Sequence, residues 1–270
     1  MSTCPSFKSN VSITFIGTAT AILEIDGIKF LTDPFFSPAE STFDSPRVQL
    51  HVHADPALGL KDLPPIDAVL LSHEDHYDNL DPVGRQLLDG RHVFTTVDGA
   101  KQLVPRPGVV GMSPWDETEI ALGGKTFRIT ATPCDHVPGG ECVGFILATE
   151  SFGVSSDGRP NAIYFTGDTV YVDELAKMAD KFHIAAALMN VGEARVQIEP
   201  PPAPKRQITM GGKQAARLFR DIKADWIIPM HYEAWDHFTQ NGEMLSKEFK
   251  DEGVLDKVKW LVPGKPVKIL

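Results

Sequence analysis

The stretch that decides the fold is Asp67-Ala-Val-Leu-Leu-Ser-His-Glu-Asp-His-Tyr-Asp-Asn-Leu80. Its apolar run, from Ala68 to Leu71, is typical of a buried strand. Two histidines and three acids follow at once, between His73 and Asn79. Charges at the end of a core strand are costly to bury unless they are paired or bind a cation. Because imidazole and carboxylate are preferred ligands of zinc-like ions, the stretch predicts one wall of a metal site.

Three further apolar runs end in the same way, with a histidine or an aspartate shortly after the predicted strand. They are Ile129-Thr-Ala-Thr-Pro-Cys-Asp-His136, Ile163-Tyr-Phe-Thr-Gly-Asp168 and Ile227-Ile-Pro-Met-His231. Strand ends on one edge of a sheet converge in space, so ligands from several strands can build one site. One histidine after a strand is usually a packing residue, but four such strands predict a shared metal site.

Composition bounds the class of protein. The 270 residues include 42% hydrophobic and 23% charged residues, as in ordinary globular proteins. A formal net charge of −10 argues against a surface built for nucleic acid or anionic lipid. Three cysteines do not suggest a disulfide framework, and no apolar run is long enough for a signal peptide or a transmembrane segment. We therefore expect a cytoplasmic protein that acts on a small molecule, of undetermined oligomeric state.

The rest of the chain alternates predicted strands and helices. Hairpins are expected around Asp26-Gly27 and Gly123-Gly124. Residues 35–65 form one long predicted loop that contains His51-Val-His53-Ala-Asp55-Pro56. No strand leads into that histidine-rich run, so a surface loop is favoured over a role in the metal site. Helices are expected over 81–89, 98–103, 173–181 and 209–222, a loop over 105–114, and a late strand over 257–262.

Five segments resemble the metallo-β-lactamase fold superfamily. They are Phe15-Ile-Gly-Thr-Ala-Thr20, Leu31-Thr-Asp-Pro34, Ser72-His-Glu-Asp-His76, Thr166-Gly-Asp168 and Ile228-Pro-Met-His-Tyr232. The sequence looks closest to the branch with L-ascorbate-6-phosphate lactonase-like and N-acyl-phosphatidylethanolamine phospholipase-like hydrolases. The resemblance implies an α/β fold, the four-layer αββα sandwich of the metallo-β-lactamase type. It implies a single domain over residues 11–270, after a flexible N-terminus of residues 1–10.

The superfamily binds two metal ions with a His-x-His-x-Asp-His run and three later ligands. By resemblance the later roles fall on His136, Asp168 and His231, with Asp168 bridging the two ions. Asp33 resembles a position that orients a ligand, although an aspartate that starts a turn before proline is an equally good interpretation. Cys134 is expected to pack near the site rather than to bind metal.

The first run departs from the family pattern in either of two alignments. A gapless alignment uses His73-Glu-Asp75-His76 as the second half of the run and puts Leu71 in the first histidine slot. The other inserts one residue after His73, uses His76-Tyr-Asp78-Asn79 as the second half, and puts Asn79 where a histidine is expected. Each alignment lacks one ligand. We favour the gapless alignment, which predicts the metal ligands His73, Asp75, His76, His136, Asp168 and His231.

The predicted function is a metal-dependent hydrolase. A metal-bound hydroxide would attack an ester, lactone, thioester, amide or phosphodiester of a small molecule, with Asp75 and Asp168 as catalytic groups. Tyr232 and His237 are candidates to contact the substrate. The expected cofactor is one or two zinc ions, with manganese or iron as alternatives. Two other interpretations stay open: a mononuclear iron dioxygenase-like redox enzyme, and a degenerate member of the family without catalysis.

Overall fold

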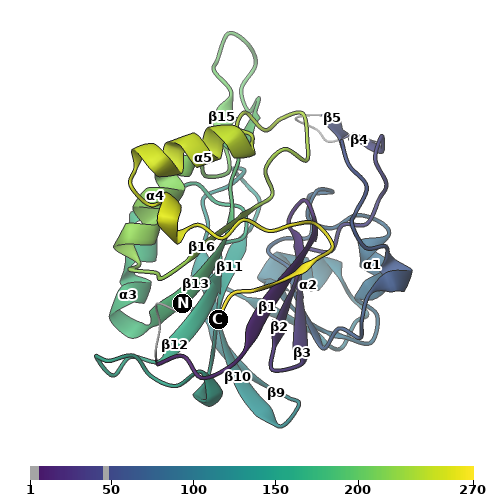
Figure 1. Cartoon of the computed structure of the whole chain (residues 1–270). Coiled ribbons are helices and arrows are strands. Elements are labelled where there is room, and N and C mark those ends of the chain that lie inside the picture. Colours follow the sequence, from purple (N-terminus) through teal and green to yellow (C-terminus); the bar gives the residue numbers. More distant parts are fainter. Residues whose placement is uncertain (1–5, 45–48) are drawn as a thin grey trace.

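Two β-sheets lie face to face in the centre of the molecule, and helices cover their outer faces (Figure 1). The structure, a computed structural model, describes residues 6–44 and 49–270. In spatial order the first sheet contains β17 (Pro266–Lys268), β1 (Val11–Gly17), β2 (Thr20–Ile25), β3 (Ile28–Thr32), β6 (Ala68–Leu70), β7 (His92–Thr96) and β8 (Val109–Met112). The second contains β16 (Ile227–Met230), β13 (His183–Asn190), β12 (Asn161–Phe165), β11 (Val143–Thr149), β10 (Lys125–Pro133) and β9 (Glu117–Leu122).

The remaining elements are short. The helices are α1 (Gly84–Leu87) and α2 (Val97–Gln102) beside the first sheet, and α3 (Met178–Lys181), α4 (Gly212–Asp221) and α5 (Gly242–Asp251) beside the second (Figure 1). Two small hairpins pair β4 (Thr42–Asp44) with β5 (Gln49–His51), and β14 (Arg195–Val196) with β15 (Arg206–Gln207). Among the described residues, the 3₁₀ turns are η1 (Leu60–Asp62), η2 (Glu150–Phe152), η3 (Asp173–Lys177) and η4 (Leu255–Lys257).

Strand alternation explains the four layers. In β2, Leu23 points into the apolar core between the sheets, while its neighbour Ile22 points outward to the core under α1. In β12, Ile163 lies between the sheets and Tyr164 packs toward α4 and α5. Each central strand therefore buries both faces, as expected where helices cover a sheet. The predicted α/β fold with four αββα layers is confirmed.

The direction of the strands brings several strand ends to one edge of the second sheet. β10 and β12 both run antiparallel to β11, so they run parallel to each other. β12, β13 and β16 are also mutually parallel. In the first sheet β3 and β6 are parallel, so Asp33 and Ser72 follow neighbouring strand ends. The predicted convergence of strand ends therefore involves two sheets rather than one.

Several local predictions are confirmed and others are wrong. Both predicted hairpins form, with Asp26 at φ 49° and Gly27 at φ 90°, the positive angles that such a tight turn requires. The predicted strand over 257–262 is wrong, because η4 ends at Lys257 and the residues after it form only a single bridge, between Val258 and Ile227. The predicted loop over 105–114 contains β8, and α4 begins after Gly211 rather than at Thr209.

The N-terminal segment lies partly outside the described residues. Residues 1–5 of the expected flexible N-terminus cannot be compared with the structure. Ser9 is buried, and its hydroxyl donates to the Ser151 carbonyl at 3.1 Å. No helix in the described ranges has the length and apolar character needed to cross a membrane.

Candidate metal centre

Three imidazoles converge at the end of β6 and β10. Nδ1 of His76 lies 3.0 Å from Nε2 of His73 and 3.1 Å from Nε2 of His136. His73 follows β6 in the first sheet, whereas His136 follows β10 in the second. The two sheets thus meet at this group, which contains three of the predicted ligands.

Hydrogen bonds indicate which ring nitrogens carry protons. Nδ1–H of His136 donates to the Ile208 carbonyl at 2.7 Å, so Nε2 of the neutral ring is bare. The Ser72 hydroxyl donates to the Asp33 carboxylate at 2.8 Å and accepts from Nδ1 of His73 at 2.8 Å, which leaves Nε2 of His73 bare. Burial lowers the pKa of His73 and of His136, and this keeps both rings neutral.

Two bare nitrogens therefore face Nδ1 of His76. One proton on His76 can satisfy only one of them, because a hydrogen bond needs a donor and an acceptor. A divalent cation instead accepts all three lone pairs at once, and three histidines are a common zinc ligand set. The side chains of this group therefore fit a zinc-like ion.

A second group contains two carboxylates and one imidazole. Nε2 of His231 lies 3.2 Å from Oδ2 of Asp168 and 3.7 Å from Oδ2 of Asp78. All three side chains are buried, and Nδ1 of His231 has no partner among the described residues. Two buried carboxylates leave excess negative charge even if His231 is protonated, so this group also fits a cation.

The members of the second group influence each other electrostatically. Burial acts to raise the pKa of Asp168, but the charge of His231 and its hydrogen bond bring that pKa well below its usual value. Burial acts to lower the pKa of His231, and the Asp168 and Asp78 carboxylates raise it above its usual value. Asp168 is therefore an ionised carboxylate beside the His231 imidazole.

Local backbone conformation positions the side chains of Asp168 and His231. Gly167 adopts φ +59°, and a Cβ there would lie 2.7 Å from the Val143 carbonyl, so the turn after β12 requires glycine. The Asn190 amide, at the end of β13, donates to Oδ1 of Asp168 at 2.7 Å. His231 itself has φ 73°, a strained angle of the kind found at functional sites.

A buried carboxylate supports the first group from behind. Asp33 accepts hydrogen bonds from the Ser72 backbone at 2.6 Å, the Ser72 hydroxyl at 2.8 Å and the Asn79 amide at 2.9 Å. Burial and the nearby Asp168 charge raise the pKa of Asp33 to about 7. Three converging donors suit the ionised form, and a cation beside Asp168 would reduce the repulsion. Asp33 thus holds the Ser72 hydroxyl that contacts His73.

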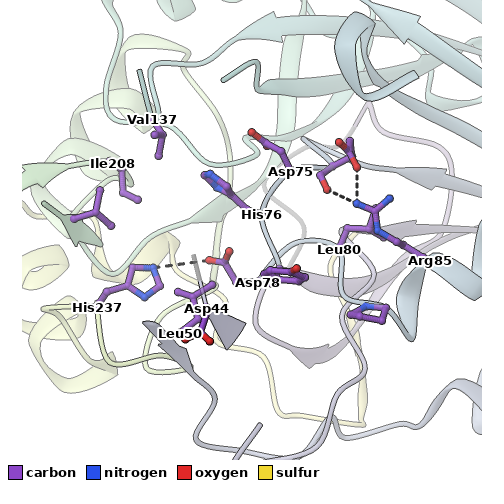
Figure 2. Close-up of a pocket in the computed structure, with 14 residues that line it drawn as sticks. Asp44, Leu50, Asp75, His76, Asp78, Leu80, Arg85, Val137, Ile208 and His237 are labelled. Carbon is purple, nitrogen blue, oxygen red and sulfur yellow. Dashed lines mark hydrogen bonds and ion pairs between the residues drawn. The ribbon is translucent and has the colours of Figure 1, made fainter. Parts of the chain in front are cut away.

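Both groups border one cavity of about 460 Å³. Figure 2 shows His76, Asp78 and His237 along its wall, with Nε2 of His237 3.8 Å from Oδ2 of Asp78. Val137 and Ile208 provide apolar lining on the side of β10 and β15. Burial lowers the pKa of His237 to about 4, so its ring is neutral. The cavity can therefore present a small molecule to both groups.

The structure gathers five of the six predicted ligands. Asp75 is exposed and belongs to neither group, whereas Asp78 is buried and belongs to the second. This geometry corresponds to the alignment with one residue inserted after His73. Asn79 then takes the last position of the run, and its amide donates to Asp33 instead of facing the ligands.

Other predicted and unpredicted residues are also placed. The thiol of Cys134 donates to the Thr166 carbonyl at 3.4 Å, and Cys134 belongs to neither group. Tyr232 packs against Trp260 and does not line the cavity. Asn190 and Ser72 were missed by sequence reasoning. Asn190 could have been found from the sequence, because it is a polar residue at the end of the apolar strand β13. His136, Asp168 and His231 likewise follow the ends of apolar strands.

Comparisons with known proteins agree with this geometry. Residues 29–232 match the model of the β-lactamase superfamily domain. The chain is 26% identical over 264 residues to a UPF0173 metal-dependent hydrolase of Methanopyrus kandleri, covering 93% of this chain and 97% of that protein. It is 29% identical over 205 residues to the N-acyl-phosphatidylethanolamine-hydrolyzing phospholipase D 1 of Caenorhabditis elegans, covering 70% of this chain but only 56% of that enzyme.

A solved structure shares the same fold. The crystal structure of isothiocyanate hydrolase from Delia radicum gut bacteria superposes with a TM-score of 0.76 at 22% identity, covering 95% of this chain and 98% of that one. The family model covers most of this chain, and the first curated relative is a metal-dependent hydrolase. The chain therefore belongs to the β-lactamase superfamily and is a metal-dependent hydrolase of the metallo-β-lactamase fold.

Proposed function

We propose that this protein hydrolyses an ester, lactone, thioester, amide or phosphodiester of a small molecule with two divalent ions. The observation that carries the proposal is that His76 of the first group and Asp78 of the second line the same cavity. His73, His76 and His136 would hold one ion, and Asp78, Asp168 and His231 would hold the other. Asp78 replaces Asp75 in this assignment because Asp75 is exposed.

The chain contributes orientation, charge and exclusion of water. A divalent ion with an open coordination position supplies Lewis acidity and lowers the pKa of water to about 7. Asp78 holds negative charge at the wall of the cavity and can accept a proton at Oδ2 during turnover, while the ionised Asp168 carboxylate lies beside His231. Val137 and Ile208 keep the substrate side apolar, which strengthens these electrostatic interactions.

The lining narrows the expected substrates. Asp44 and Asp75 add negative charge to the lining of the cavity, while the Glu74 carboxylate and the Arg85 guanidinium neutralise each other as an ion pair. A multiply anionic substrate would meet repulsion there, whereas a neutral ester or lactone would not. We expect turnover of neutral esters and lactones to exceed that of phosphodiesters, and phosphate monoesters to be poor substrates.

Metal analysis and a substrate panel test the proposal. We expect zinc or manganese, up to two ions per chain, in protein purified without added metal, and hydrolysis that chelation abolishes. His136→Ala and Asp168→Asn should lose activity, while His92→Ala, at an exposed histidine outside both groups, should retain it. One iron per chain, with neither zinc nor manganese, would replace this proposal with the redox interpretation. A metal-loaded protein inactive on every substrate class would favour the non-catalytic interpretation.

A further inference from the structure

A third group of metal-binding side chains lies outside the cavity, in the loop that sequence reasoning treated as a surface feature. It consists of His51, His53 and Asp236, whose ligand atoms all lie within 4.8 Å of one another. None of these three residues belongs to the two groups at the strand ends. The segment before Asp236 follows β16, so the group joins two parts of the chain that are far apart in sequence.

Backbone pairing puts these three side chains on one face. Val52 forms an antiparallel bridge with Trp235, and the backbone N–H of His53 donates to the Ala234 carbonyl at 3.1 Å. Val52 and Trp235 both point inward and are buried. In an extended chain alternate residues point to opposite sides, so His51 and His53 share the outer face with Asp236. The group follows from the pairing and does not depend on chance side-chain rotation.

The atoms converge around the Asp236 carboxylate. Nε2 of His53 lies 2.8 Å from Oδ1 of Asp236, and Nδ1 of His51 lies 3.8 Å from Oδ2. The other nitrogen of His51, Nε2, lies 3.3 Å from Oε2 of Glu40. A carboxylate on the far nitrogen of an imidazole orients a metal-binding histidine and makes it more basic. Glu40 stands in that position relative to His51.

Simple ion pairing is a weaker explanation of the same group. Exposed ion pairs contribute about 0–1 kcal/mol, and pairs with histidine require a protonated ring. Asp236 is 60% exposed and His53 is 41% exposed, so neither side chain is held in place by burial. Two imidazoles and a carboxylate are, in contrast, a ligand set that zinc accepts, with a position left for water.

We propose that His51, His53 and Asp236 bind one zinc-like divalent ion at a surface site separate from the main centre, with Glu40 orienting His51. The bound ion fastens the strand around Val52 to the segment that carries His237. Because Leu50 and His237 line the cavity, the ion stabilises one wall of the cavity without contacting the substrate. This inference does not depend on the reaction assigned to the main centre.

Counting zinc tests the site. Wild-type protein, the double variant His51→Ala/His53→Ala and the control His92→Ala would be equilibrated with micromolar free zinc and passed through a desalting column before elemental analysis. The double variant should hold one zinc fewer per chain than the wild type and the control. Asp236→Asn, which preserves side-chain shape, should weaken zinc binding at the same site in a chelator competition.

Two further measurements test whether the lost zinc reflects misfolding of the variant or loss from the main centre. Thermal unfolding in EDTA should give the same Tm for wild type and double variant, whereas added zinc should raise the wild-type Tm more. In a His136→Ala/His231→Ala background, removal of His51 and His53 should still remove one zinc. Equal zinc counts in the wild type and the double variant, or an equal zinc-dependent Tm rise, would overturn the inference.

Discussion

Replacing one of two neighbouring carboxylates distinguishes the two alignments of the first ligand run. Asp78→Asn and Asp75→Asn remove one negative charge each and preserve side-chain shape. Asp78 is 5% exposed and lies 3.7 Å from Nε2 of His231, whereas Asp75 is exposed and belongs to neither ligand group. We therefore expect Asp78→Asn to weaken metal binding strongly and Asp75→Asn to leave it nearly unchanged.

The burial of each carboxylate determines how much metal affinity its variant is expected to lose. Unit charges about 4 Å apart interact by about 4 kcal/mol at an effective dielectric of about 20 and by about 1 kcal/mol in water. A divalent ion doubles these values, to about 8 and about 2 kcal/mol. The cost of desolvating the buried carboxylate offsets about half of the attraction of about 8 kcal/mol. The remaining contribution of Asp78 to metal binding is about 4 kcal/mol. That corresponds to a loss of affinity of about a thousandfold. Salt screening reduces the effect at Asp75 to about threefold or less.

Competition with a chromophoric chelator measures the affinity, and elemental analysis after gel filtration gives ions per chain. Unfolding in urea without metal tests whether Asp78→Asn simply destabilises the fold. In the metal-free protein Asp78 and Asp168 repel each other, so removal of one of these charges is not expected to destabilise the fold. Asp78→Asn should therefore change the free energy of unfolding by less than about 1 kcal/mol. If Asp75→Asn loses an ion while Asp78→Asn keeps the wild-type affinity, the gapless alignment is right and the assignment of Asp78 is refuted.

Three further changes test the support of the site and of the fold. Asn190→Ala removes the amide that donates to Asp168, so the affinity for the second ion should fall about 10- to 100-fold in the same competition assay. Gly167→Ala forces a Cβ to 2.7 Å from the Val143 carbonyl at a positive φ, and should lower the free energy of unfolding by about 3 kcal/mol in urea. Burial acts to raise the pKa of Asp26, but hydrogen bonds from Lys125 and Asn10 lower it to about 2. The stability that Asp26 adds is therefore complete above its ordinary pKa of 3.8 and is lost as the pH falls toward 2, so the advantage of wild type over Asp26→Asn, about 1 kcal/mol at pH 6, should shrink over that range.

Each of these has a clear contrary result. Unchanged metal affinity in Asn190→Ala would mean that the amide does not orient Asp168. Wild-type stability in Gly167→Ala would mean that the turn can relax into another conformation. An Asp26→Asn difference that is the same at pH 6 and near pH 2 would mean that the Asp26 charge contributes nothing.

The architecture could be predicted from the sequence because it depends on local periodicity. Alternating apolar residues in segments such as Val11–Phe15 mark strands that bury a face, and Asp26-Gly27 is typical of a tight hairpin. The strand-terminal position of His136, Asp168 and His231 also follows from this pattern. Helix α5 was not predicted; Asn241 caps it through its side chain, a short signal that does not stand out without tertiary context.

Other parts of the site could not be predicted because they depend on non-local packing. Whether Asp75 or Asp78 faces inward depends on how the loop after β6 turns against β10, which no local pattern determines. Asp33 was expected either to orient a ligand or to start a turn. It accepts hydrogen bonds from Ser72 and Asn79, some forty residues away, and the Ser72 hydroxyl contacts His73, but these partners could not be named from the sequence. His51 and His53 were interpreted as surface-loop residues because no strand was predicted before them. In the structure β5 ends at His51, and Asp236, which is distant in the sequence, lies beside both histidines.

The Ile208 carbonyl links the range of accepted substrates to the retention of metal. Ile208 lines the cavity, and its carbonyl also fixes the proton on Nδ1 of His136. A loop change that enlarged the cavity at Ile208 would remove the hydrogen bond between its carbonyl and Nδ1–H of His136. The His136 ring could then turn or carry its proton on Nε2, and Nε2 would no longer be available to a metal ion. Selection for bulkier substrates therefore meets a trade-off on this wall. Such adaptation is expected at Leu50, which lines the cavity without holding a ligand of the main centre.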